Sequence, residues 1–439
     1  MTAQITWQIP PSVLQHLAEI PSDRPVAVLM RHSVRPYLAP GDAGYSLPIT
    51  ELGVHLACEL GTRLSGQIRS IHTSPLLRCR QTAEALCAGA SAELTIHPDR
   101  LLGDPGVFVV DNRRGGQEWC GRGHEAVMAH LVGHDEPLPG LSRPEPAARF
   151  LVHHMLATAG TTSGYHVFVT HDSLVTATAA RLLKKPLGKE AWPWYLEAAF
   201  FWREDAAVKV AYRGMVGRRN EPLLCDLVHD DVIELARREI GRTIGLDCPA
   251  RFFLAGGAFK TLLSGKSPRD LDLWAASPHD REVLVAALLE RGATPLEPRP
   301  YTDVFSLGDS VLEVPHKAEP ATLTERLARF DIALSAVGVE HLGGDRWSAQ
   351  IHPLARASVE QRKVLLLKPL VNWRHALGTL ERMRRYRDEL GYEVPPEEEA
   401  EVWKVFEAQD PEMQRGMVDR FARTTRGSSV GAEAQCRLR

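Results

Sequence analysis

The sequence predicts an α/β protein with a helix-covered sheet in its first half, a second and smaller α/β segment, and a helical C-terminal extension. Three buried strand-like runs carry this prediction: "PVAVLM" (25–30), "IRSIHTS" (68–74) and "YHVFVTHDS" (165–173). Each run leads through a loop into a helical pattern. Repeated units of this kind are typical of a sheet covered by helices, with functional residues at the carboxyl ends of the strands.

The helices between these strands are predicted by apolar residues at helical spacing. One covers 50–64, with Thr50 as its N-cap, and the next covers 75–89, with Pro75 in its first turn. A third helix over 174–183 follows the last of the three strands.

Three further features complete the first half. Residues Leu101 to Gly140 are rich in Gly, Asp and Arg and predict a long insertion over the strand ends. The run "FWREDAAVKVAYRG" (201–214) predicts a hairpin-like pair of strands, and a domain boundary is expected near Met215 to Pro222.

Length and composition agree with an ordinary globular protein of two or three domains. The chain has 439 residues, of which 44% are hydrophobic and 24% charged. The formal net charge of −3 excludes a global attraction to nucleic acid or to a membrane surface. Any contact with nucleic acid therefore has to come from a local patch.

The cysteines and the N-terminus indicate the compartment. The seven cysteines are scattered, odd in number and without a C-x-x-C pair, which argues against a disulfide framework or a zinc site. The N-terminal "MTAQITWQIPPSVLQHL" lacks the pattern of a signal peptide, and no apolar run is long enough to span a bilayer. We expect a cytoplasmic protein with no membrane partner.

Three strand ends carry residues that suit a phosphate group. They are Arg31-His32, Ser74 leading to Arg78, and His171-Asp172. Each alone has a plain structural explanation, a strand end that reaches solvent. Carboxyl ends of parallel strands meet at one edge, however, where arginines bind phosphate oxygens and a neutral imidazole can attack phosphorus. Together they predict a phosphoryl-transfer site.

The motifs "LMRHS", "SPLLRCRQTAEAL" and "FVTHDS" resemble the histidine phosphatase superfamily, over roughly Val26 to Gly214. The resemblance implies a three-layer α/β domain in which His32 becomes phosphohistidine. It also implies that Arg31, Arg78 and His171 bind the phosphoryl group. No metal cofactor is implied for this domain, because arginines hold the negative charge.

The resemblance leaves the proton donor open between two aspartates. Arg35 fits an additional arginine of the acid-phosphatase branch, and Asp172 fits the proton donor of that branch. The chain is short like the mutase branch, whose donor lies in the region of the insertion, so Asp104 in "LLGDPG" is a rival. Ser33 replaces the glycine that usually follows the Arg-His pair.

The second half carries a carboxylate motif, "FFLAGGAFKTLLSGKSPRDLDLWAAS" (252–277). Asp270 and Asp272 alternate on a strand and so point to one face, where two carboxylates repel unless a cation such as Mg²⁺ bridges them. The alternative is a solvated edge strand. The turn at Gly256-Gly257 suits a close approach to phosphates, and Glu313 in "SVLEVPHK" adds a third carboxylate.

This segment resembles the nucleotidyltransferase fold of the DNA polymerase beta superfamily, and most closely the head of CCA-adding enzymes and bacterial poly(A) polymerases. Gly256, Gly257, Lys260, "LLSG" and Asp270/Asp272 follow in the order of the family's motif. Lys260 stands where that family usually has arginine, and the residue after it is Thr261 instead of aspartate.

The nucleotidyltransferase resemblance covers about Arg251 to Val339 and implies two Mg²⁺ ions that support transfer from a nucleoside triphosphate. Asp270, Asp272 and Glu313 are the implied metal ligands, with Asp303 and Asp309 as rivals of Glu313. The run "ARFDIALSAVG" is similar to the family's next motif. It implies that Asp331 contacts the ribose or the nucleotide. The same contact is less clearly implied for Arg329.

The C-terminal region is helical and rich in arginine. Arg374, Arg382, Arg384, Arg385 and Arg387 cluster around Trp373 and Tyr386. A solvated helix face is the favoured explanation, and an acceptor-substrate or RNA-backbone surface is the alternative.

Four segments are therefore predicted. They are a histidine phosphatase-like domain (1–215), a nucleotidyltransferase domain (222–345), a helical extension (346–425) and a disordered tail (426–439).

The two motifs together predict an enzyme with two activities, phosphomonoester hydrolysis and Mg²⁺-dependent nucleotidyl transfer. The expected partners are a nucleoside triphosphate and a phosphorylated acceptor, which is RNA or a small molecule. Processing of RNA 3′ ends is one pathway of this kind. Nucleotidylation of a small phosphorylated metabolite is the second hypothesis, and a degenerate binding module in place of one domain is the third.

Overall fold

The computed structural model describes residues 7–38, 44–220, 228–425 and 428–438. The chain divides into two compact units, Met1–Leu224 and Cys225–Arg439, and each is described by itself. The expected boundary near Met215 to Pro222 falls close to this division, although Met215–Asn220 still forms the last strand of the first unit and residues 221–227 lie outside the described residues.

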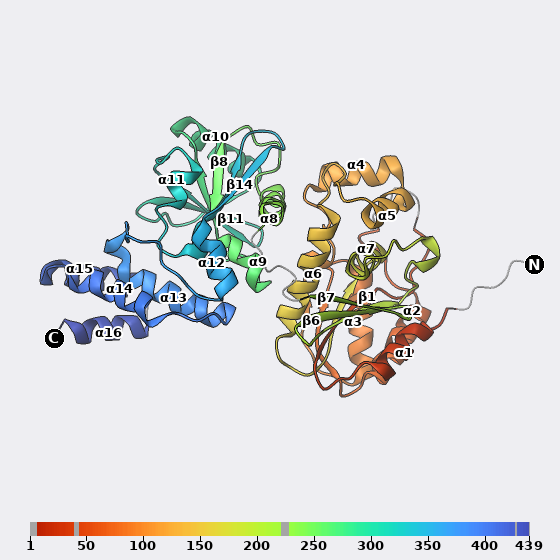
Figure 1. The fold of residues 1–439 in the computed structure, drawn as a ribbon. Coiled ribbons are helices and arrows are strands. Elements are labelled where there is room, and N and C mark those ends of the chain that lie inside the picture. The colour runs from red at the N-terminus through yellow and green to blue at the C-terminus, as the bar shows by residue number, and fades with distance from the viewer. Residues whose placement is uncertain (1–6, 39–43, 221–227, 426–427, 439) are drawn as a thin grey trace, which may run out of the picture. The chain divides into compact units, whose positions relative to one another are not determined.

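The first unit is built on a seven-stranded sheet with the order β3-β2-β4-β1-β5-β6-β7. Figure 1 labels β1, β6 and β7 of this sheet. Strands β3, β2, β4 and β1 run parallel, and β5, β6 and β7 continue the sheet antiparallel. The predicted hairpin is the pair β5 and β6. The strands are β1 (Pro25–Arg31), β2 (Ile68–Thr73), β3 (Ile96–Pro98), β4 (Gly164–Thr170), β5 (Ala198–Glu204), β6 (Ala207–Tyr212) and β7 (Met215–Asn220).

Helices cover both faces of this sheet, which confirms the three-layer α/β prediction. Alternate residues of β1 show the two faces: Val26, Val28 and Met30 pack in the core under α1, α2 and α3, whereas Ala27 and Leu29 pack under α5, α6 and α7. The helices are α1 (Pro11–Glu19), α2 (Glu51–Arg63), α3 (Leu77–Ala90), α4 (Asn112–Arg122), α5 (His124–Gly133), α6 (Pro144–Ala159) and α7 (Asp172–Leu183), with short 3₁₀ turns at Arg100–Leu102 and Lys189–Ala191.

The helices begin at or within two residues of the positions that local sequence signals predict. Thr50 caps α2, since its hydroxyl accepts a hydrogen bond from the Gly53 N–H. The helix predicted over 75–89 begins two residues later, at Leu77. The expected insertion contains α4 and α5, so it adds helices of its own rather than a simple loop.

The second unit holds a sheet of the order β10-β11-β12-β9-β8-β13-β14. Strand β9 lies between β12, with which it runs parallel, and β8, with which it runs antiparallel. The strands are β8 (Phe252–Ala255), β9 (Leu271–Ala275), β10 (Thr294–Pro295), β11 (Thr302–Leu307), β12 (Ser310–Pro315), β13 (Val337–His341) and β14 (Trp347–Ile351).

The helices of this unit extend to its C-terminus. They are α8 (His229–Arg242), α9 (Thr261–Ser264), α10 (Pro278–Glu290), α11 (Leu323–Leu327), α12 (Pro353–Gln361), α13 (Ala376–Leu390), α14 (Pro396–Glu407), α15 (Pro411–Thr424) and α16 (Ser429–Arg437), with 3₁₀ turns at Gly257–Lys260, Ala333–Ser335 and Trp373–His375. The α/β segment followed by helices agrees with the predicted fold class.

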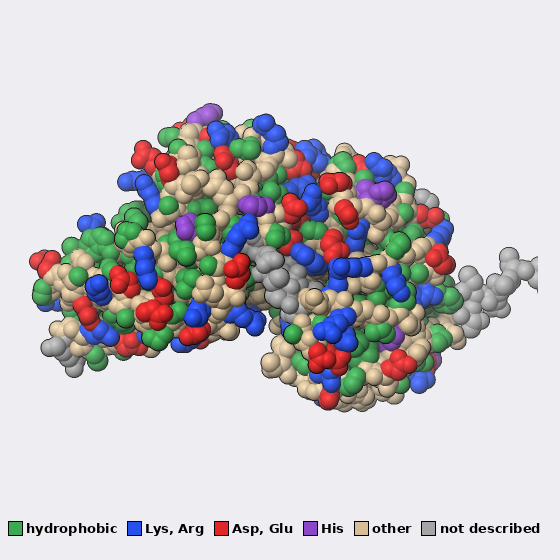
Figure 2. Space-filling model, viewed as in Figure 1, with side chains coloured by type: hydrophobic (Ala, Val, Ile, Leu, Met, Phe, Trp, Pro, Cys, Tyr) green, Lys and Arg blue, Asp and Glu red, His purple; other side chains and the backbone are tan. Residues whose placement is uncertain are grey.

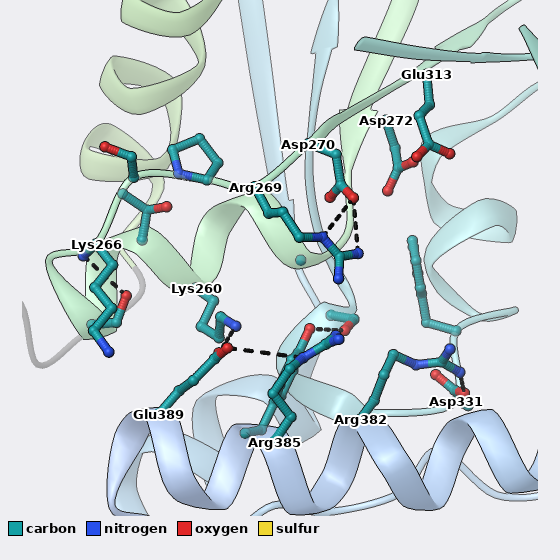
Figure 3. A pocket seen from close by; sticks show the side chains of 18 of the residues that line it. Lys260, Lys266, Arg269, Asp270, Asp272, Glu313, Asp331, Arg382, Arg385 and Glu389 are labelled. Carbon is teal, nitrogen blue, oxygen red and sulfur yellow. Dashed lines mark hydrogen bonds and ion pairs between the residues drawn. The ribbon is translucent and has the colours of Figure 1, made fainter. Parts of the chain in front are cut away.

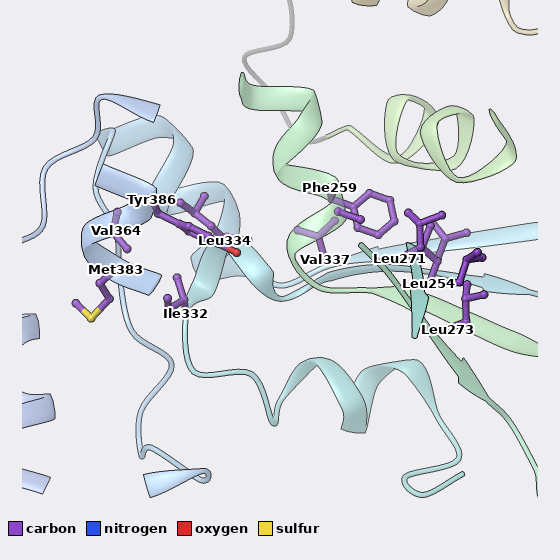
Figure 4. Packing of buried hydrophobic residues seen from close by; sticks show 14 of the residues in the cluster. Leu254, Phe259, Leu271, Leu273, Ile332, Leu334, Val337, Val364, Met383 and Tyr386 are labelled. Carbon is purple, nitrogen blue, oxygen red and sulfur yellow. The ribbon is translucent and has the colours of Figure 1, made fainter. Parts of the chain in front are cut away.

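One hydrophobic cluster joins the sheet of the second unit to its C-terminal helices (Figure 4). It contains Leu254 and Phe259 near the sheet and Met383 and Tyr386 on α13, and it continues to Trp403 and Phe406 on α14. The helical extension thus shares a core with the α/β segment.

The C-terminal tail differs from the prediction of disorder. Ser428 caps α16, and Val430 and Ala434 on this helix are buried against the same core. Alternating small apolar residues in "SSVGAEAQC" allow this packing. Amino-acid composition alone does not predict it. Residues 426–427 and 439 lie outside the described residues.

Surface charge is mixed. Basic and acidic side chains alternate over both units on the face drawn in Figure 2, in keeping with the net charge of −3. Of the helices that the structure describes, none is long and apolar enough to cross a membrane.

Candidate active sites

The carboxyl ends of β1, β2 and β4 bring the predicted phosphate-binding residues together. Arg31 at the end of β1 pairs with Thr170 of β4, and Thr73 at the end of β2 pairs with Val169 of the same strand. The residues that follow these ends therefore meet at one edge of the sheet. The rings of His32 and His171 lie 5.7 Å apart, centroid to centroid.

His32 is held as a neutral imidazole with a free ring nitrogen. It is only 3% exposed, and its Nδ1 lies 2.8 Å from the carbonyl oxygen of Ser33. Because a carbonyl only accepts, Nδ1 carries the proton and the lone pair is on Nε2. Burial, then the charges of His171, Arg31 and Arg78, keep the pKa of His32 well below its usual value.

His171 is oriented by two neighbours. The guanidinium of Arg78 donates from Nη2 to Nδ1 of His171 over 3.3 Å, which leaves the ring proton on Nε2, 3.2 Å from the hydroxyl of Ser74. Burial and the Arg78 charge lower the pKa of His171 to about 3. His171 is thus a neutral donor at the same edge.

Two guanidinium groups offer donors for an anion. Arg31 lies 4.3 Å above the ring of Tyr195 and donates to the carbonyl of Pro193 over 2.6 Å. Arg78 donates to the carbonyl of Gly44 over 2.6 Å. The Nε atoms of Arg31 and Arg78 are both buried and have no acceptor within the described part of the chain. A phosphoryl group would supply the missing acceptors.

Arg35 lies at the rim of this site. It is half-buried and donates to the carbonyl of Pro36 over 2.9 Å. Its charge contributes to lowering the pKa of Arg78, after burial and partly offset by Cys79. The structure therefore places Arg35 near the other arginines without a direct contact to His32.

The two rival proton donors lie in different surroundings. Asp172 accepts from Arg31 Nη2 at 3.2 Å and lies 3.5 Å from His124 Nε2. Burial raises the pKa of Asp172, but Arg31 and then His124 outweigh burial and hold it well below the usual value. Asp104 is half-buried and lies 3.4 Å from the hydroxyl of Tyr45.

The inserted helices add residues that the sequence analysis missed. His124 at the start of α5 contacts Asp172, and Trp119 Nε1 on α4 donates to His124 Nδ1 over 3.4 Å. No motif marks either residue, because they reach the site only through the path of the insertion.

In the second unit, Asp270, Asp272 and Glu313 point into one pocket (Figure 3). Asp272 on β9 is paired with Glu313 on the parallel strand β12, so their side chains share one face of the sheet. The rivals of Glu313 lie elsewhere: Asp303 pairs with Arg281, and Asp309 is exposed in the turn before β12.

These carboxylates repel one another. Burial, then Asp270 and Glu313, raise the pKa of Asp272 to about 7. Burial also raises the pKa of Glu313, although the nearby Arg299 opposes this. Carboxylate oxygens are the donors that Mg²⁺ prefers, so the chemistry of these side chains suits the predicted metal.

Two arginines partly neutralise the carboxylates. Arg269 donates to Asp270 from Nη2 over 2.8 Å, and Arg299 pairs with Glu313. In this arrangement, no group of three or more His, Cys, Asp or Glu side chains in the described ranges is gathered closely enough to hold a metal ion.

The Gly256-Gly257 turn lets the backbone approach these carboxylates. Gly256 has a φ of +105°, a conformation that favours glycine. A Cβ atom there would lie 3.3 Å from the ring of Phe330 and 3.4 Å from Asp272 Oδ2. The turn therefore brings the backbone close to the predicted metal ligands, with Gly257 in the lining of the pocket, while the N–H of Gly256 donates to the carbonyl of Val337 over 3.1 Å.

Basic side chains surround the same pocket, which encloses about 500 Å³. Lys260 lies 4.5 Å from the ring centroid of Tyr386 and pairs with Glu389 on α13. Burial and then the charges of Arg385, Arg269 and Lys266 lower the pKa of Lys260 to about 8. The pocket thus places basic side chains next to the carboxylates of Asp270, Asp272 and Glu313.

Asp331, the predicted nucleotide contact, is engaged by α13. Its carboxylate is buried and accepts from Thr379 and Arg382. Burial raises the pKa of Asp331, but Arg382 and Thr379 outweigh burial and lower it. Asp331 lines the pocket and also positions Arg382 there. Arg329 is exposed outside the pocket.

The arginines of α13 divide between two faces of the helix. Arg382 and Arg385 line the pocket, whereas Arg384 is held by Glu399 and Glu433, and Arg387 pairs with Asp388. The spacing 382, 385 and 389 is the helical signal that identifies the pocket face. The arginine cluster is therefore not one continuous basic surface.

The sequence matches the family model of the histidine phosphatase superfamily (branch 1) over residues 28–198. This match confirms the histidine phosphatase domain that the strand-end motifs predicted. No curated protein matches the sequence.

Several solved structures match the chain in part. A tRNA-processing enzyme in an apo form has 18% identity and a TM-score of 0.35, covering 46% of this chain and 56% of that one. The CCA-adding enzyme of Thermotoga maritima in complex with tRNA has 13% identity and a TM-score of 0.32, covering 45% and 48%. A CCA-adding enzyme with ATP has 14% identity and a TM-score of 0.34, covering 44% and 48%. This chain thus spans about half the length of the structures that it matches.

Proposed function

We propose that this chain, whose residues 28–198 match the histidine phosphatase superfamily, is an enzyme with two activities. Its first unit hydrolyses phosphomonoesters through a phosphohistidine, and its second unit transfers a nucleotidyl group from a nucleoside triphosphate to a hydroxyl. Each activity has its own site and is supported by its own geometry.

The phosphatase proposal rests on one observation: a neutral His32 with its lone pair on Nε2 stands beside buried guanidinium donors that lack acceptors. Nε2 attacks phosphorus, and the bond from phosphorus to the ester oxygen breaks. Arg31, Arg78 and His171 stabilise the charge on the phosphoryl oxygens. The departing oxygen takes a proton from a carboxylic acid, and water then hydrolyses the phosphohistidine.

We assign the proton donor to Asp104 rather than to Asp172. A general acid must hold a proton before the reaction begins, and Arg31 and His124 keep Asp172 ionised. Asp172 then positions Arg31 through their ion pair of 3.2 Å.

The test of the phosphatase is the covalent intermediate. Wild-type protein quenched during turnover of an aryl phosphate should carry one acid-labile phosphoryl group on His32. His32→Ala should lose the intermediate and at least about a thousandfold in rate. His55→Ala, at an exposed histidine on α2, is the matched control. Undiminished hydrolysis by His32→Ala would refute the assignment.

The transferase proposal rests on the pairing of Glu313 with Asp272 beside Asp270 in a pocket lined by basic side chains. Asp270, Asp272 and Glu313 would hold Mg²⁺, which supplies charge stabilisation for the acceptor hydroxyl and the departing pyrophosphate when it is bound. The Gly256-Gly257 backbone, Lys260 and Arg385 bind the triphosphate.

Incorporation of label from each of the four nucleoside triphosphates, with a pool of RNA or metabolites as acceptors, tests the transferase. Asp270→Ala and Asp272→Ala should each lose on the order of a hundredfold or more in rate. Asp309→Ala removes an exposed carboxylate outside the pocket and serves as the control. If wild-type protein bound no triphosphate with Mg²⁺ present, the second unit would be a degenerate binding module.

The order of the two reactions follows from their chemistry. A terminal phosphate blocks the hydroxyl that a nucleotidyltransferase must activate, so hydrolysis would precede transfer on one acceptor. Processing of RNA 3′ ends fits this order. The second candidate is nucleotidylation of a small phosphorylated metabolite. Whether the label enters RNA or a small molecule of the acceptor pool distinguishes the two candidates.

A further inference from the structure

A cavity of about 660 Å³ opens beside the phosphatase site. Arg78 and His171, two residues of the phosphoryl site, form part of its wall. The apolar part of the lining is contributed by Leu76, Phe108, Trp119, Leu131 and Leu174. The cavity therefore borders two of the residues that the phosphatase proposal assigns to the phosphoryl group.

Helix α4 makes room for this cavity by lacking side chains. Gly115 and Gly116 both line it, and a Cβ atom added at Gly116 would meet no atom within 4 Å. A larger residue at Gly116 would occupy this open space, whereas a Cβ atom at the buried Gly115 would lie 3.1 Å from Leu141 and 3.3 Å from Val109. The insertion thus builds a hollow, and does not merely cover the strand ends.

The rim of the cavity is polar. The exposed side chains of Tyr45, Asn112 and Arg113 line it together with Asp104. An apolar hollow with an aromatic wall and a few polar groups at its mouth is typical of a site for a small organic ligand, and its volume lies in the range of about 300–1,000 Å³ found for such sites.

We propose that this cavity binds the leaving group of the phosphatase substrate, and that the leaving group is a nucleoside. This inference rests on the proposed phosphatase activity. The base packs against Trp119, the sugar lies toward Arg78 and His171, and the polar rim contacts the edge of the base. Transfer of the phosphoryl group to His32 breaks the bond to the sugar oxygen, which takes a proton and leaves as a free hydroxyl.

The experiment compares hydrolysis of adenosine 3′-monophosphate with that of glycerol phosphate, a small phosphomonoester without a ring. Wild-type protein should show a kcat/KM at least about tenfold higher for the nucleotide, mainly through a lower KM, since a buried aromatic group adds binding energy. Equal values for the two substrates would overturn the inference.

A pair of variants on α4 tests the cavity directly. Gly116→Leu places a side chain in open space at the lining and should raise the KM for the nucleotide about tenfold, while changing that for glycerol phosphate much less. Gly121→Leu is the matched control: it lies on the same exposed helix, also meets no atom within 4 Å, and is outside the lining. Equal effects of both variants, or of Gly116→Leu on both substrates, would overturn the inference.

Trp119 provides a second route to the same answer. Trp119→Ala should remove the preference for the nucleotide, whereas Trp119→Phe, which keeps a ring but loses the N–H that contacts His124, should retain most of it. If Trp119→Phe and Trp119→Ala lost the preference equally, the ring would not be binding the base.

Failure of this inference differs from failure of the proposed phosphatase. If both esters are hydrolysed with equal kcat/KM and hydrolysis requires His32, only the nucleoside assignment is refuted. Absence of hydrolysis of either ester, or hydrolysis that survives His32→Ala, removes the phosphatase and this inference with it.

Discussion

Asp104 and Asp172 both lie near the phosphatase site, but their partners differ: Arg31 and His124 contact Asp172, whereas Asp104 lies 3.4 Å from the hydroxyl of Tyr45. Arg31 contacts Asp172 at 3.2 Å and stabilises its ionised form. For a group whose pKa is lowered in this way, protonation requires a pH well below neutral. The two aspartates should therefore behave differently when each is replaced by the isosteric amide.

Asp104→Asn should slow hydrolysis of alkyl phosphates by roughly 10²–10⁴-fold while sparing p-nitrophenyl phosphate, because a good leaving group needs no proton. Asp172→Asn should slow both substrates by similar factors, because it releases Arg31. The measurement is kcat across esters of increasing leaving-group pKa. The opposite pattern, with the dependence confined to Asp172→Asn, would return the donor role to Asp172.

His72 makes the first unit sensitive to acid. Burial and the charge of His97 lower the pKa of His72 from 6.5 to about 4. The unfolded chain therefore binds more protons than the folded one between these values, and stability from neutral His72 is complete above pH 6.5 and is lost as the pH falls toward 4.

His72→Gln should consequently lose less stability than wild type between pH 7 and pH 5. Urea unfolding at both pH values measures the difference, and the change with pH is compared rather than the absolute stability, because the variant also loses stacking on Phe168. His55→Gln, at an exposed site, should retain the wild-type acid sensitivity. Identical acid sensitivity in His72→Gln and wild type would contradict the prediction.

At the scale of the element, helix α13 serves two purposes through two faces. Met383 and Tyr386 pack in the core, while Arg382 and Arg385 line the pocket (Figures 3 and 4). Arg382 also neutralises the buried Asp331, so its removal would destabilise the fold as well as weaken binding. Arg385 makes the cleaner test, since its ion pair with Glu389 is long, at 3.9 Å.

Arg385→Ala should weaken binding of a nucleoside triphosphate by about tenfold or more, because a charged hydrogen bond to phosphate contributes roughly 1.5–3 kcal/mol. Arg387→Ala removes an exposed arginine two residues further along, paired with Asp388, and should bind as wild type does. Isothermal titration measures both. Equal losses would mean that general charge, rather than the pocket face of the helix, attracts the ligand.

At the scale of the whole molecule, each unit has cores of its own. The clusters that contain Leu29 and Val28 belong to the first unit, and those that contain Leu254 and Phe253 belong to the second. No described residue of one unit is a member of the other's clusters. Damage to one core should leave the other activity in place.

Phe406→Ala tests this independence. Phe406 on α14 is fully buried in the core that joins the helices to the sheet, and its truncation should cost about 3–5 kcal/mol. We expect the unfolding transition of the second unit to shift to lower temperature and transfer to weaken, with phosphatase activity unchanged. Leu289→Ala, at an exposed leucine on α10, is the control. Parallel loss of both activities in Phe406→Ala would contradict separate cores.

Local patterns in the chain determined the strands, the two motifs and most of the residues around them. Arg31-His32, His171 and Asp270-Asp272 could be identified because each lies in a buried strand or directly beside one of its ends, and strand periodicity is a local property. The tail shows the limit of this reasoning, since α16 forms through contacts of Val430 and Ala434 with a distant core.

Tertiary structure decided which distant residues join these motifs. Glu313 rather than Asp303 faces Asp272 because β12 pairs with β9 in one register. Trp119 and His124 reach the phosphatase site because the insertion folds back over the strand ends, and the pocket face of α13 depends on which side of that helix packs on the sheet. Contacts between residues far apart in sequence follow from sheet order and helix packing, which no local pattern encodes.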